Sequence, residues 1–463
     1  MKKTLYGFLV VLIGALALAA AGCGGDDNGG GGGGEAGGGG GQSGGGGGGV
    51  QALPSSSCEA VEYGGEGEPD VLIASDLPMQ GSSRTQTVQM VEAIRFILEQ
   101  RDWKAGDLNV AYQVCDDSTA QAGKWDSGKC SQNGQAYASN EDVVGIIGTF
   151  NSGCAAIMIP ILNQAPGGGL AMVSPANTYV CLTEGAPPGC DQTEPAKYYP
   201  TGNRNYIRVV ANDALQGAAL AQFTKDQGVQ SVYILNDKEA YGQGIAENYR
   251  NAVQHLGIEV AGFAAWDPKQ ASYEALMRQI KQSGADAVFL GGLIDENGAQ
   301  LIKDKVAVLG PNDGDVKLIA PDGFTQQSTI DESGVENARG MFMSIAGVPI
   351  EDLEGDGQEF IEAFKEELGG DPVDPYAAYG AQAAVVLLEA IARSDGSRSS
   401  VIQELFNTNM QNSILGSFQI NENGDPTQAE GGVVGFTIYR AEEELVTETT
   451  ISPDQEVVEA ARG

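Results

Sequence analysis

Two loops rich in glycine and hydroxyl residues each follow an apolar run. Val143–Ile147 leads into a loop that contains Phe150 and Ser152, and Leu170–Val173 leads into a loop that ends at Thr178. At the carboxyl ends of parallel strands such loops bind ligands, and the amides of a following helix favour an anion. The two hydroxyls add donors, which suits a small carboxylate. Glycine and serine are also ordinary turn residues, so these loops alone favour a turn.

Complementary chemistry follows later in the chain. Tyr241 lies in the loop after the apolar run Ser231–Leu235, and Asp322 follows another such run. An α-amino acid needs an acceptor for its ammonium group and donors for its carboxylate, so Asp322 and the hydroxyl loops would complement its two ends. A turn aspartate and a helix-start tyrosine are the alternatives. Gln80 and Arg84, in the loop after the first strand, could reach the same cleft.

Catalytic motifs are mostly missing from the sequence. The glycine spacing of Gly148–Gly153 matches a P-loop, but Cys154 stands where the lysine is needed. Ser152 lies outside any GxSxG elbow, and the single histidine, His255, ends an amphipathic helix, where it faces solvent or compensates the dipole. Without CxxC or a second histidine, a zinc site is not expected. Two-carboxylate catalysis stays open, although no pair stands out. We therefore predict no enzyme, no metal and no cofactor.

The elements that must position these residues alternate between strand and helix. The strands of a first series are expected at Asp70–Ser75, Asn109–Val114, Val143–Ile147 and Leu170–Val173, with helices at Thr85–Gln100 and Ala155–Asn163. A second series has strands at Ser231–Leu235, Glu259–Phe263, Ala287–Leu290 and Lys317–Ala320, with helices at Leu215–Gln227, Ile245–Leu256, Tyr273–Gln282 and Ala299–Leu309. After these we expect a strand at Met341–Ile345, two helices at Gln358–Leu368 and Tyr376–Ala392, and two strands at Gly416–Ile420 and Val433–Tyr439. Such alternation predicts two α/β lobes, each a parallel sheet covered by helices on both faces, with a cleft between them.

The N-terminal residues indicate export. Two lysines precede a short apolar run that ends in small residues before Cys23, so Met1–Gly22 is expected to be a cleaved signal. A retained membrane anchor is the alternative. Gly24–Gly49 is almost all glycine and cannot bury apolar surface, which predicts a disordered tether. The net charge of −36 argues against nucleic-acid binding and against adsorption to anionic lipid.

Six cysteines remain after Cys23, an even number that indicates disulfides in an exported chain. The shortest loops pair Cys115 with Cys130 and Cys181 with Cys190, which leaves Cys58 for Cys154. Other pairings stay open, because spacing alone does not fix connectivity.

Several stretches, taken in order, resemble one family. They are DVLIASDLPMQG, VCDDSTAQ, VVGIIGTFNSGC, LAMVSPANT, YILNDKEAYGQG, AVFLGG, LIAPDGF and GSFQINENGD. From about Asp70 to Tyr439 the chain resembles the periplasmic substrate-binding proteins of branched-chain amino acid ABC importers, the Leu/Ile/Val-binding type. The resemblance implies a type I periplasmic-binding-protein fold of the α/β class. It places a three-crossover hinge between two doubly wound lobes, near Arg208–Asn212, Ser344–Gly347 and Gly416–Gln419.

The resemblance also implies roles for single residues. Ser152 would bind the ligand carboxylate, and Asn177 (through its backbone) with Thr178 would contact carboxylate and ammonium. Tyr241 would cover the ligand from the second lobe, and Asp322 would accept from the ammonium group.

Two positions depart from the family pattern. Ile294 stands where an aromatic residue often occurs, and Arg84 lies near an aromatic position of the first loop. These departures leave the preferred ligand side chain open, because Arg84 could admit a polar or acidic side chain or simply face solvent. A signal of the lipoprotein type would make Cys23 the acylated residue, although Ala20 stands where leucine is commoner.

We expect five segments: a signal at 1–22, an acylated cysteine and tether at 23–57, a first lobe at 58–209 with 346–416, a second lobe at 210–345 with 417–450, and a C-terminal tail at 451–463. The expected function is a monomeric, extracytoplasmic lipoprotein of the cell membrane that binds a small amino acid and delivers it to the permease of an ABC importer. Receptors for amides, urea or other small polar solutes, and a sensory ligand-binding protein, are the alternatives.

Overall fold

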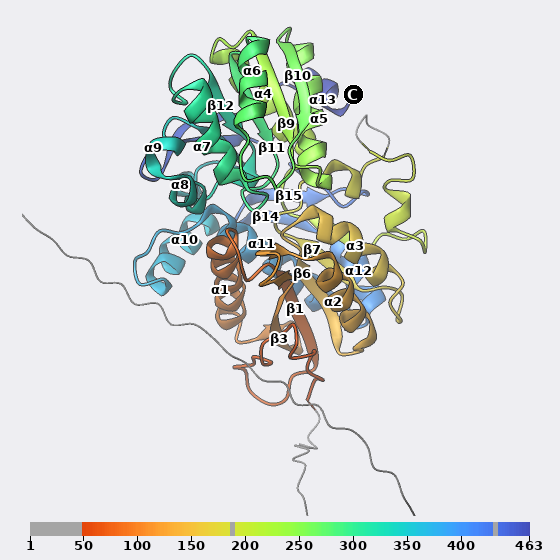
Figure 1. The fold of residues 1–463 in the computed structure, drawn as a ribbon. Coiled ribbons are helices and arrows are strands. Elements are labelled where there is room, and N and C mark those ends of the chain that lie inside the picture. The colour runs from red at the N-terminus through yellow and green to blue at the C-terminus, as the bar shows by residue number, and fades with distance from the viewer. Residues whose placement is uncertain (1–48, 186–189, 429–433) are drawn as a thin grey trace, which may run out of the picture. The chain divides into compact units, whose positions relative to one another are not determined.

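The computed structural model of the protein describes residues 49–185, 190–428 and 434–463. The expected signal Met1–Gly22, Cys23 and the tether up to residue 48 lie outside the described residues. Residues Gly48–Gly463 fold as one unit, which contains two α/β lobes with a separate sheet in each (Figure 1). None of the described helices is long and apolar enough to cross a membrane.

The first lobe is built on a six-stranded sheet in the order β2-β3-β1-β6-β7-β8, parallel except for β2. Its strands are β1 Val71–Leu77, β2 Lys104–Ala105, β3 Leu108–Asp116, β6 Val143–Gly148, β7 Ala171–Ser174 and β8 Tyr206–Arg208, with the small pair β4 Ser118–Thr119 and β5 Lys124–Trp125 beside them. Its helices are α1 Arg84–Gln100, α2 Ser127–Ser139, α3 Ser152–Asn163, α10 Asp356–Glu367, α11 Pro375–Arg393 and α12 Arg398–Phe406. The sequence did not predict α2, α12 or β8.

The second lobe is built on a seven-stranded sheet in the order β10-β9-β11-β12-β13-β17-β18, in which β17 runs antiparallel to both of its neighbours, β13 and β18. Its strands are β9 Ser231–Asn236, β10 Glu259–Ala265, β11 Ala287–Gly291, β12 Lys317–Ala320, β13 Phe342–Ala346, β17 Phe436–Ala441 and β18 Leu445–Ile451. Its helices are α4 Asp213–Asp226, α5 Ala240–His255, α6 Glu274–Ser283, α7 Gly298–Leu309, α8 Gln327–Ser333, α9 Val335–Ala338 and α13 Gln455–Arg462. The predicted alternation of strand and helix is confirmed in both lobes.

Buried strands explain why both faces of each sheet carry helices. In β1, Val71 and Ile73 belong to one apolar cluster, whereas Leu72 and Ala74 belong to another. Successive side chains of a strand point to opposite faces, so a strand that is apolar throughout must be covered twice. Helices α1 and α11 cover one face of the first sheet, and α2 and α3 cover the other. The carboxyl ends of the strands stay free of these helices, and the loops there build the site.

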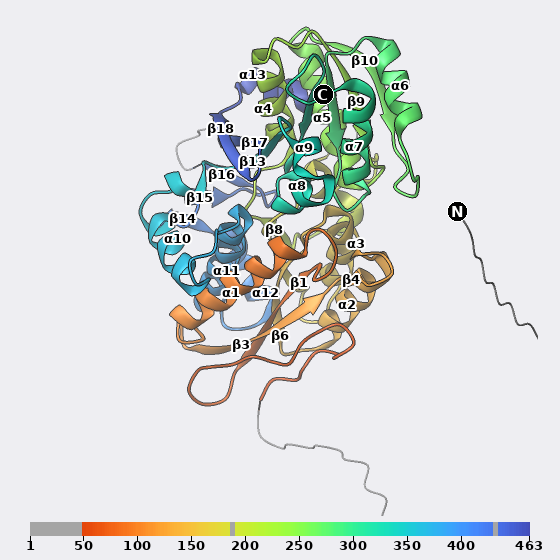
Figure 2. The ribbon, with the colours of Figure 1, turned by 60° about the vertical axis from the view of Figure 1, so that its left-hand side comes forward.

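The chain passes between the lobes three times. It leaves the first sheet after β8, returns after β13, and reaches the second sheet again at β17. The sequence placed the third crossover at Gly416–Gln419, but these residues lie in β15 Gly416–Ile420, between β14 Asn409–Ser413 and β16 Pro426–Gln428. Figure 2 shows β13, β15, β16 and β17 on one side of the unit. The amide of Gly347 donates to the carbonyl of Gly435 at 2.8 Å, which holds the second and third crossovers together.

The disulfides join Cys58 to Cys115, Cys130 to Cys154, and Cys181 to Cys190. Only the last of the three predicted pairs is confirmed; the pairs Cys115–Cys130 and Cys58–Cys154 are wrong. The physical reason lies in the sheet, because Cys58 pairs with Cys115 of β3 in an isolated bridge. Helices α2 and α3 lie side by side on one face and bring Cys130 to Cys154. Loop length alone could not reveal either neighbour.

Both ends of the described unit pack against a lobe. Leu53, which the sequence assigned to the tether, is buried, and its amide donates to Gln113 Oε1 at 2.8 Å. At the other end, residues expected to form a tail contain α13, whose Val457 and Val458 join the apolar cluster of α4 and α5. The ordered unit therefore extends beyond the two expected lobes at each end.

Candidate ligand-binding site

A cavity between the lobes collects loops from the carboxyl ends of five strands. Its lining consists of Trp125, Phe150, Asn151, Ser152, Gly153, Ala176 and Thr178 of the first lobe and Glu239, Tyr241, Leu293, Asp322 and Gly323 of the second. The empty space among these residues is about 380 Å³, part of it open to solvent. In each sheet the strand order reverses beside the cavity, between β1 and β6 and between β9 and β11, as at the ligand sites of other doubly wound sheets.

The first lobe presents donors to the cavity. Ser152 begins α3, and the first amides of a helix have no intrahelical acceptor. The Ser152 hydroxyl lies 3.4 Å from the amide of Tyr179, so the loops after β6 and β7 meet at this point. Amides and hydroxyls at a helix N-terminus favour an anionic group. This end of the cavity can therefore bind a carboxylate.

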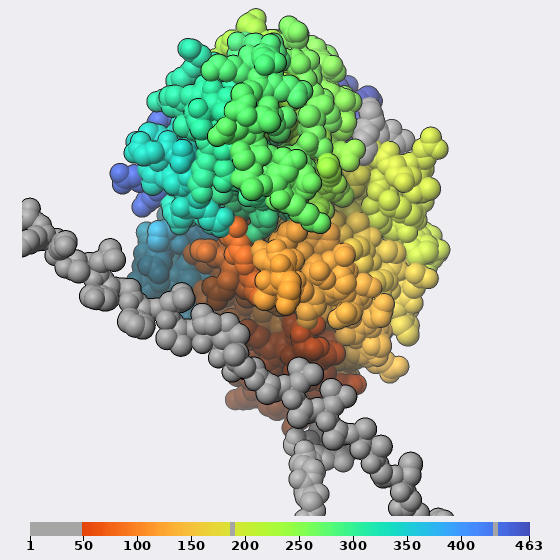
Figure 3. Space-filling view, viewed as in Figure 1, coloured from red at the N-terminus to blue at the C-terminus, as the bar shows by residue number. Residues whose placement is uncertain are grey.

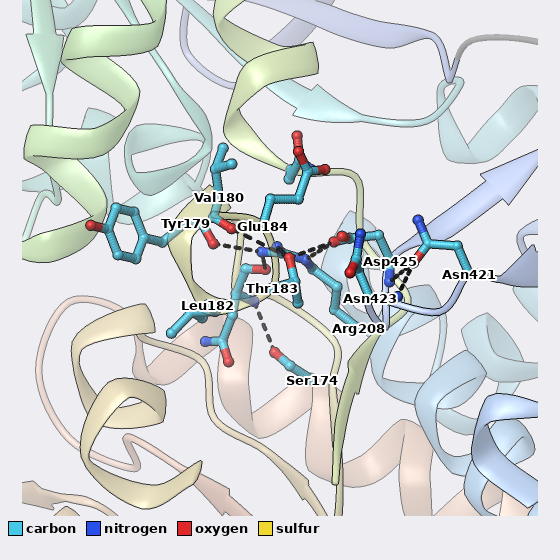
Figure 4. A network of polar contacts seen from close by, with 12 residues as sticks. Ser174, Tyr179, Val180, Leu182, Thr183, Glu184, Arg208, Asn421, Asn423 and Asp425 are labelled. Carbon is cyan, nitrogen blue, oxygen red and sulfur yellow. Dashed lines mark hydrogen bonds and ion pairs between the residues drawn. The ribbon is translucent and has the colours of Figure 1, made fainter. Parts of the chain in front are cut away.

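The loop that carries Thr178 is fixed from the first crossover. The guanidinium of Arg208 donates to the carbonyls of Asn177 and Tyr179, each at 2.9 Å, and the amide of Asp213 donates to the carbonyl of Thr178 at 2.9 Å. Figure 4 shows Arg208 beside Asp425, whose carboxylate accepts from Arg208 Nε at 2.6 Å. Arg208 is fully buried, and this ion pair with its carbonyl acceptors satisfies its charge.

The second lobe presents a carboxylate. Asp322 is buried and accepts from the phenols of Tyr241 and Tyr376, each at 2.6 Å. Burial raises the pKa of Asp322 above its usual range, and the two phenols oppose this rise. Because Tyr376 belongs to α11 of the first lobe, the two lobes meet at this carboxylate. A ligand ammonium would supply the positive charge that the site lacks.

A second buried carboxylate lies close to Asp322. Burial and then the negative charge of Asp322 raise the pKa of Asp213 well above its usual range, and the Thr178 hydroxyl opposes the rise. Asp213 opens α4, directly after the first crossover. Asp213 is not among the residues that line the cavity, so the polarity that suits an amino acid zwitterion comes from Asp322 in one lobe and the donors in the other.

Apolar side chains close the cavity. Trp125 packs against Gly153, where a Cβ atom would come within 2.6 Å of the indole ring. Phe150 meets Tyr376 edge to face, with 5.7 Å between the ring centroids. Leu293 enters from the loop after β11. These surfaces suit an apolar ligand side chain, as in other small-molecule sites.

The structure brings together five of the predicted site residues: Phe150, Ser152, Thr178, Tyr241 and Asp322 line the cavity. Three others, Gln80, Arg84 and Ile294, lie elsewhere, and Asn177, predicted to act through its backbone, stands between the lining residues Ala176 and Thr178. Gln80 donates to Asp116 at 2.9 Å, Arg84 is exposed at the start of α1, and Ile294 is buried in the core of the second lobe. The Asn177 side chain donates to the carbonyls of Thr149 and Phe150, so it ties two loops together.

Sequence reasoning missed Trp125, Asp213, Leu293 and Tyr376. Asp213 carried a usable signal, because it follows the predicted crossover Arg208–Asn212 directly. Leu293 also carried one, because it follows the predicted strand Ala287–Leu290, whereas Trp125 and Tyr376 lie in stretches without distinctive spacing. The two groupings of possible metal ligands among the described residues, Asp117 with Cys130 and Cys154 and Glu194 with Cys181 and Cys190, both contain a disulfide and so lack thiolates.

Comparison with known proteins gives consistent relatives. Residues 73–433 match the family described as periplasmic binding protein. The chain is 24% identical to a Leu/Ile/Val-binding protein homolog of Brucella abortus over 389 residues, which cover 82% of this chain and 93% of the relative. A leucine-binding protein of Thermotoga maritima has a similar fold, with a TM-score of 0.69 and 24% identity over 83% of this chain and 99% of the other. A solute-binding protein of R. palustris in complex with benzoate has a TM-score of 0.65 and 16% identity, over 83% of this chain and 98% of that one.

Proposed function

Because the chain belongs to the periplasmic binding protein family, we propose that it is an extracytoplasmic receptor that binds a small amino acid between its lobes and delivers it to an ABC importer. The observation that carries the proposal is the opposition of the helix start at Ser152 in one lobe and the carboxylate of Asp322 in the other. Relatives named for leucine, isoleucine and valine support a branched-chain or related ligand.

Ligand contacts from both lobes imply that binding favours the closed arrangement. Ser152 and Thr178 would bind the carboxylate, the backbone of Asn177 would assist, and Asp322 would accept from the ammonium group. Trp125, Phe150 and Leu293 would contact the side chain. Neither lobe alone offers both charges, so an open receptor would bind weakly.

The remaining features of the proposal concern the cell. Cys23 would carry the lipid after removal of 1–22, the receptor would act as a monomer at the outer face of the membrane, and the permease subunits of the importer would be its protein partners. Lobe boundaries at 58–209 with 346–416 and 210–345 with 417–450 belong to the same proposal. The family consists of solute-binding receptors, and we propose no catalytic step.

A thermal-shift screen tests the proposal. A solute that binds the folded chain raises the melting temperature by mass action. We expect branched-chain or other small amino acids to raise it, and calorimetry to give a stoichiometry of one. Amides, urea and benzoate form the competing panel, the last because a solved relative holds benzoate. A shift with these and none with amino acids would contradict the amino acid assignment. Mass spectrometry of solutes that copurify with the chain would identify the natural ligand.

A further inference from the structure

The loop after β11 contacts both the cavity and the opposite lobe. Leu293 of this loop lines the cavity, whereas Asp295 and Glu296 contact the first lobe. The loop is rigidly held, because Asp237 accepts from the amide of Leu293 at 3.1 Å and the indole of Trp266 donates to the carbonyl of Glu296 at 2.8 Å. A movement of this loop therefore affects the cavity and the lobe contact together.

Asp295 binds the start of α1 across the cleft. Its carboxylate accepts from the amide of Ser82 at 2.9 Å and from the hydroxyl of Ser83. Ser83 is the N-cap residue of α1, but its side chain does not cap its own helix. The anionic group that a helix N-terminus favours is thus supplied by the other lobe. A Cβ atom at Gly81 would crowd this contact at 3.3 Å from the Asp295 carboxylate, and it would also collide with the carbonyl of Gly123 in the same lobe.

A lysine continues the contact along the same face. Lys124 of the first lobe contacts Glu296 and lies 3.5 Å from Glu239, both of the second lobe. Glu239 also lines the cavity, as does Trp125, the neighbour of Lys124. Figure 3 shows orange segments of the first lobe meeting green segments of the second along this face. In a chain with a net charge of −36, a lysine between two glutamates offsets repulsion between the approaching lobes.

We infer that Asp295 is a positioning residue for ligand retention: its bonds to Ser82 and Ser83 hold the lobes closed without touching the ligand. The inference rests on the proposed function, because it deepens the account of the same site. The bonds join different lobes, so opening must break them. Affinity depends on the population of the closed arrangement, and a contact that exists only there slows dissociation.

The test compares Asp295→Ala with Asp315→Asn in the full chain. Asp315 is exposed and precedes β12, at the end of the sheet away from the cavity, so its variant is a control for a lost charge in the same lobe. With L-leucine as probe, stopped-flow tryptophan fluorescence, to which Trp125 at the cavity contributes, is expected to show dissociation roughly ten- to a hundredfold faster for Asp295→Ala and unchanged for the control. Association should be no slower for Asp295→Ala than for the control, because the bonds hold the lobes together and do not contact the ligand.

Two further arms make the outcomes decisive. Ser83→Ala and the double variant with Asp295→Ala should give non-additive losses, since both remove the same bond. X-ray scattering from the ligand-free chain should give a larger radius of gyration for Asp295→Ala than for the control. Equal radii and equal dissociation rates would overturn the inference. If the wild-type chain bound no solute of the screen, the proposed function would fail, and the scattering comparison alone would decide the role of Asp295.

Discussion

Asp322 is the residue on which the chemistry of the site depends most. Its carboxylate lies against phenols from both lobes, and its surroundings contain a second carboxylate and, among the described residues lining the cavity, no lysine or arginine. A buried anion in this position is stabilised most by a ligand that brings a positive charge. The two phenols keep the carboxylate in place, so the site is organised for an ammonium group and needs no rearrangement to bind one.

The variant Asp322→Asn tests this reading. Asparagine keeps the size of the side chain but removes its charge, so an ammonium group would lose a charge-assisted bond. We expect amino-acid affinity to fall by about 2–3 kcal/mol, measured by calorimetry. Asp331→Asn, at an exposed position of the same lobe's α8, is the matched control. Unchanged affinity in Asp322→Asn would refute the assignment of this carboxylate to the ammonium group.

The pH dependence of binding provides an independent check. Burial raises the pKa of Asp322, so its proton returns at a higher pH than in an ordinary aspartate. A protonated Asp322 cannot compensate an ammonium group. Affinity should therefore be present above this raised pKa and be lost as the pH falls through it. Titration calorimetry at successive pH values should show the loss beginning above the ordinary aspartate range, and Asp322→Asn should remove this part of the dependence.

A second aspartate controls stability instead of binding. Asp76, at the end of β1, is fully buried, accepts from Tyr137 at 2.5 Å and Asn133 at 2.8 Å, and has a pKa that burial raises to about 7. The folded chain binds this proton more tightly than the unfolded chain does. Stability from this group is therefore present at about pH 4 and is lost as the pH rises towards 7.

Urea unfolding at several pH values checks that sign. Asp76→Asn keeps the shape of the side chain and removes its titration. As the pH rises from about 4 to about 7, the unfolding free energy of the wild type should fall relative to that of the variant. Carboxylates remote from Asp76 titrate equally in both chains and cancel, whereas Asp117, whose pKa is raised by burial and then by the charge of Asp76, contributes to the same difference. If the unfolding free energies of wild type and variant changed in parallel with pH, Asp76 would not be the group that titrates.

At the scale of elements, the first crossover fixes the ligand loop. Arg208 ends β8 and contacts two carbonyls of the loop that carries Thr178, while Asp213 opens α4 and contacts the third. The crossover between the lobes is thus also the support of the carboxylate end of the site. Closure about this segment can occur without loosening the donors, because the loop and its support belong together.

Variants of the ion pair between Arg208 and Asp425 can separate an effect on stability from an effect on binding. Arg208→Met leaves Asp425 buried without its partner and should lower the unfolding free energy by about 3–5 kcal/mol, measured in urea. The double variant Arg208→Met with Asp425→Leu removes both charges and should recover most of that stability. Its affinity for amino acids should stay reduced, because the carbonyls of Asn177 and Tyr179 remain unheld. Full recovery of affinity would show that the guanidinium does not position the loop.

The sequence predicted where strands and helices lie better than it predicted which of them pack side by side. Strands such as β6 and β9 are short apolar runs, and helices such as α1 and α5 show helical spacing, so local pattern was enough. Helix α2 was missed because its serine, glycine and asparagine residues are weak helix formers and its burial is tertiary. The disulfides failed for a related reason, since the bond between Cys58 and Cys115 depends on which strand lies beside the N-terminal segment.

At the scale of the whole molecule, topology made half of the site predictable. Loops at the carboxyl ends of parallel strands must gather at one edge of each sheet, and this rule found Ser152, Thr178, Tyr241 and Asp322. Residues that enter from other directions obey no such rule. Tyr376 comes from α11, which follows the second crossover, and Trp125 comes from the small strand β5. Only the packed lobes bring them to the cavity.

The entry of the chain into the first lobe has a mechanical consequence. The amide of Gln51 donates to Asp142, just before β6, and the segment then runs along β3 to the disulfide at Cys58. The contact of Gln51 lies at the amino end of β6, whereas the disulfide of Cys58 with Cys115 lies near the carboxyl end of β3. Tension on the N-terminal side would be transmitted to the first sheet through the disulfide between Cys58 and Cys115. The second lobe would carry none of this tension, so it could move relative to the first lobe whether or not the N-terminal segment is under tension.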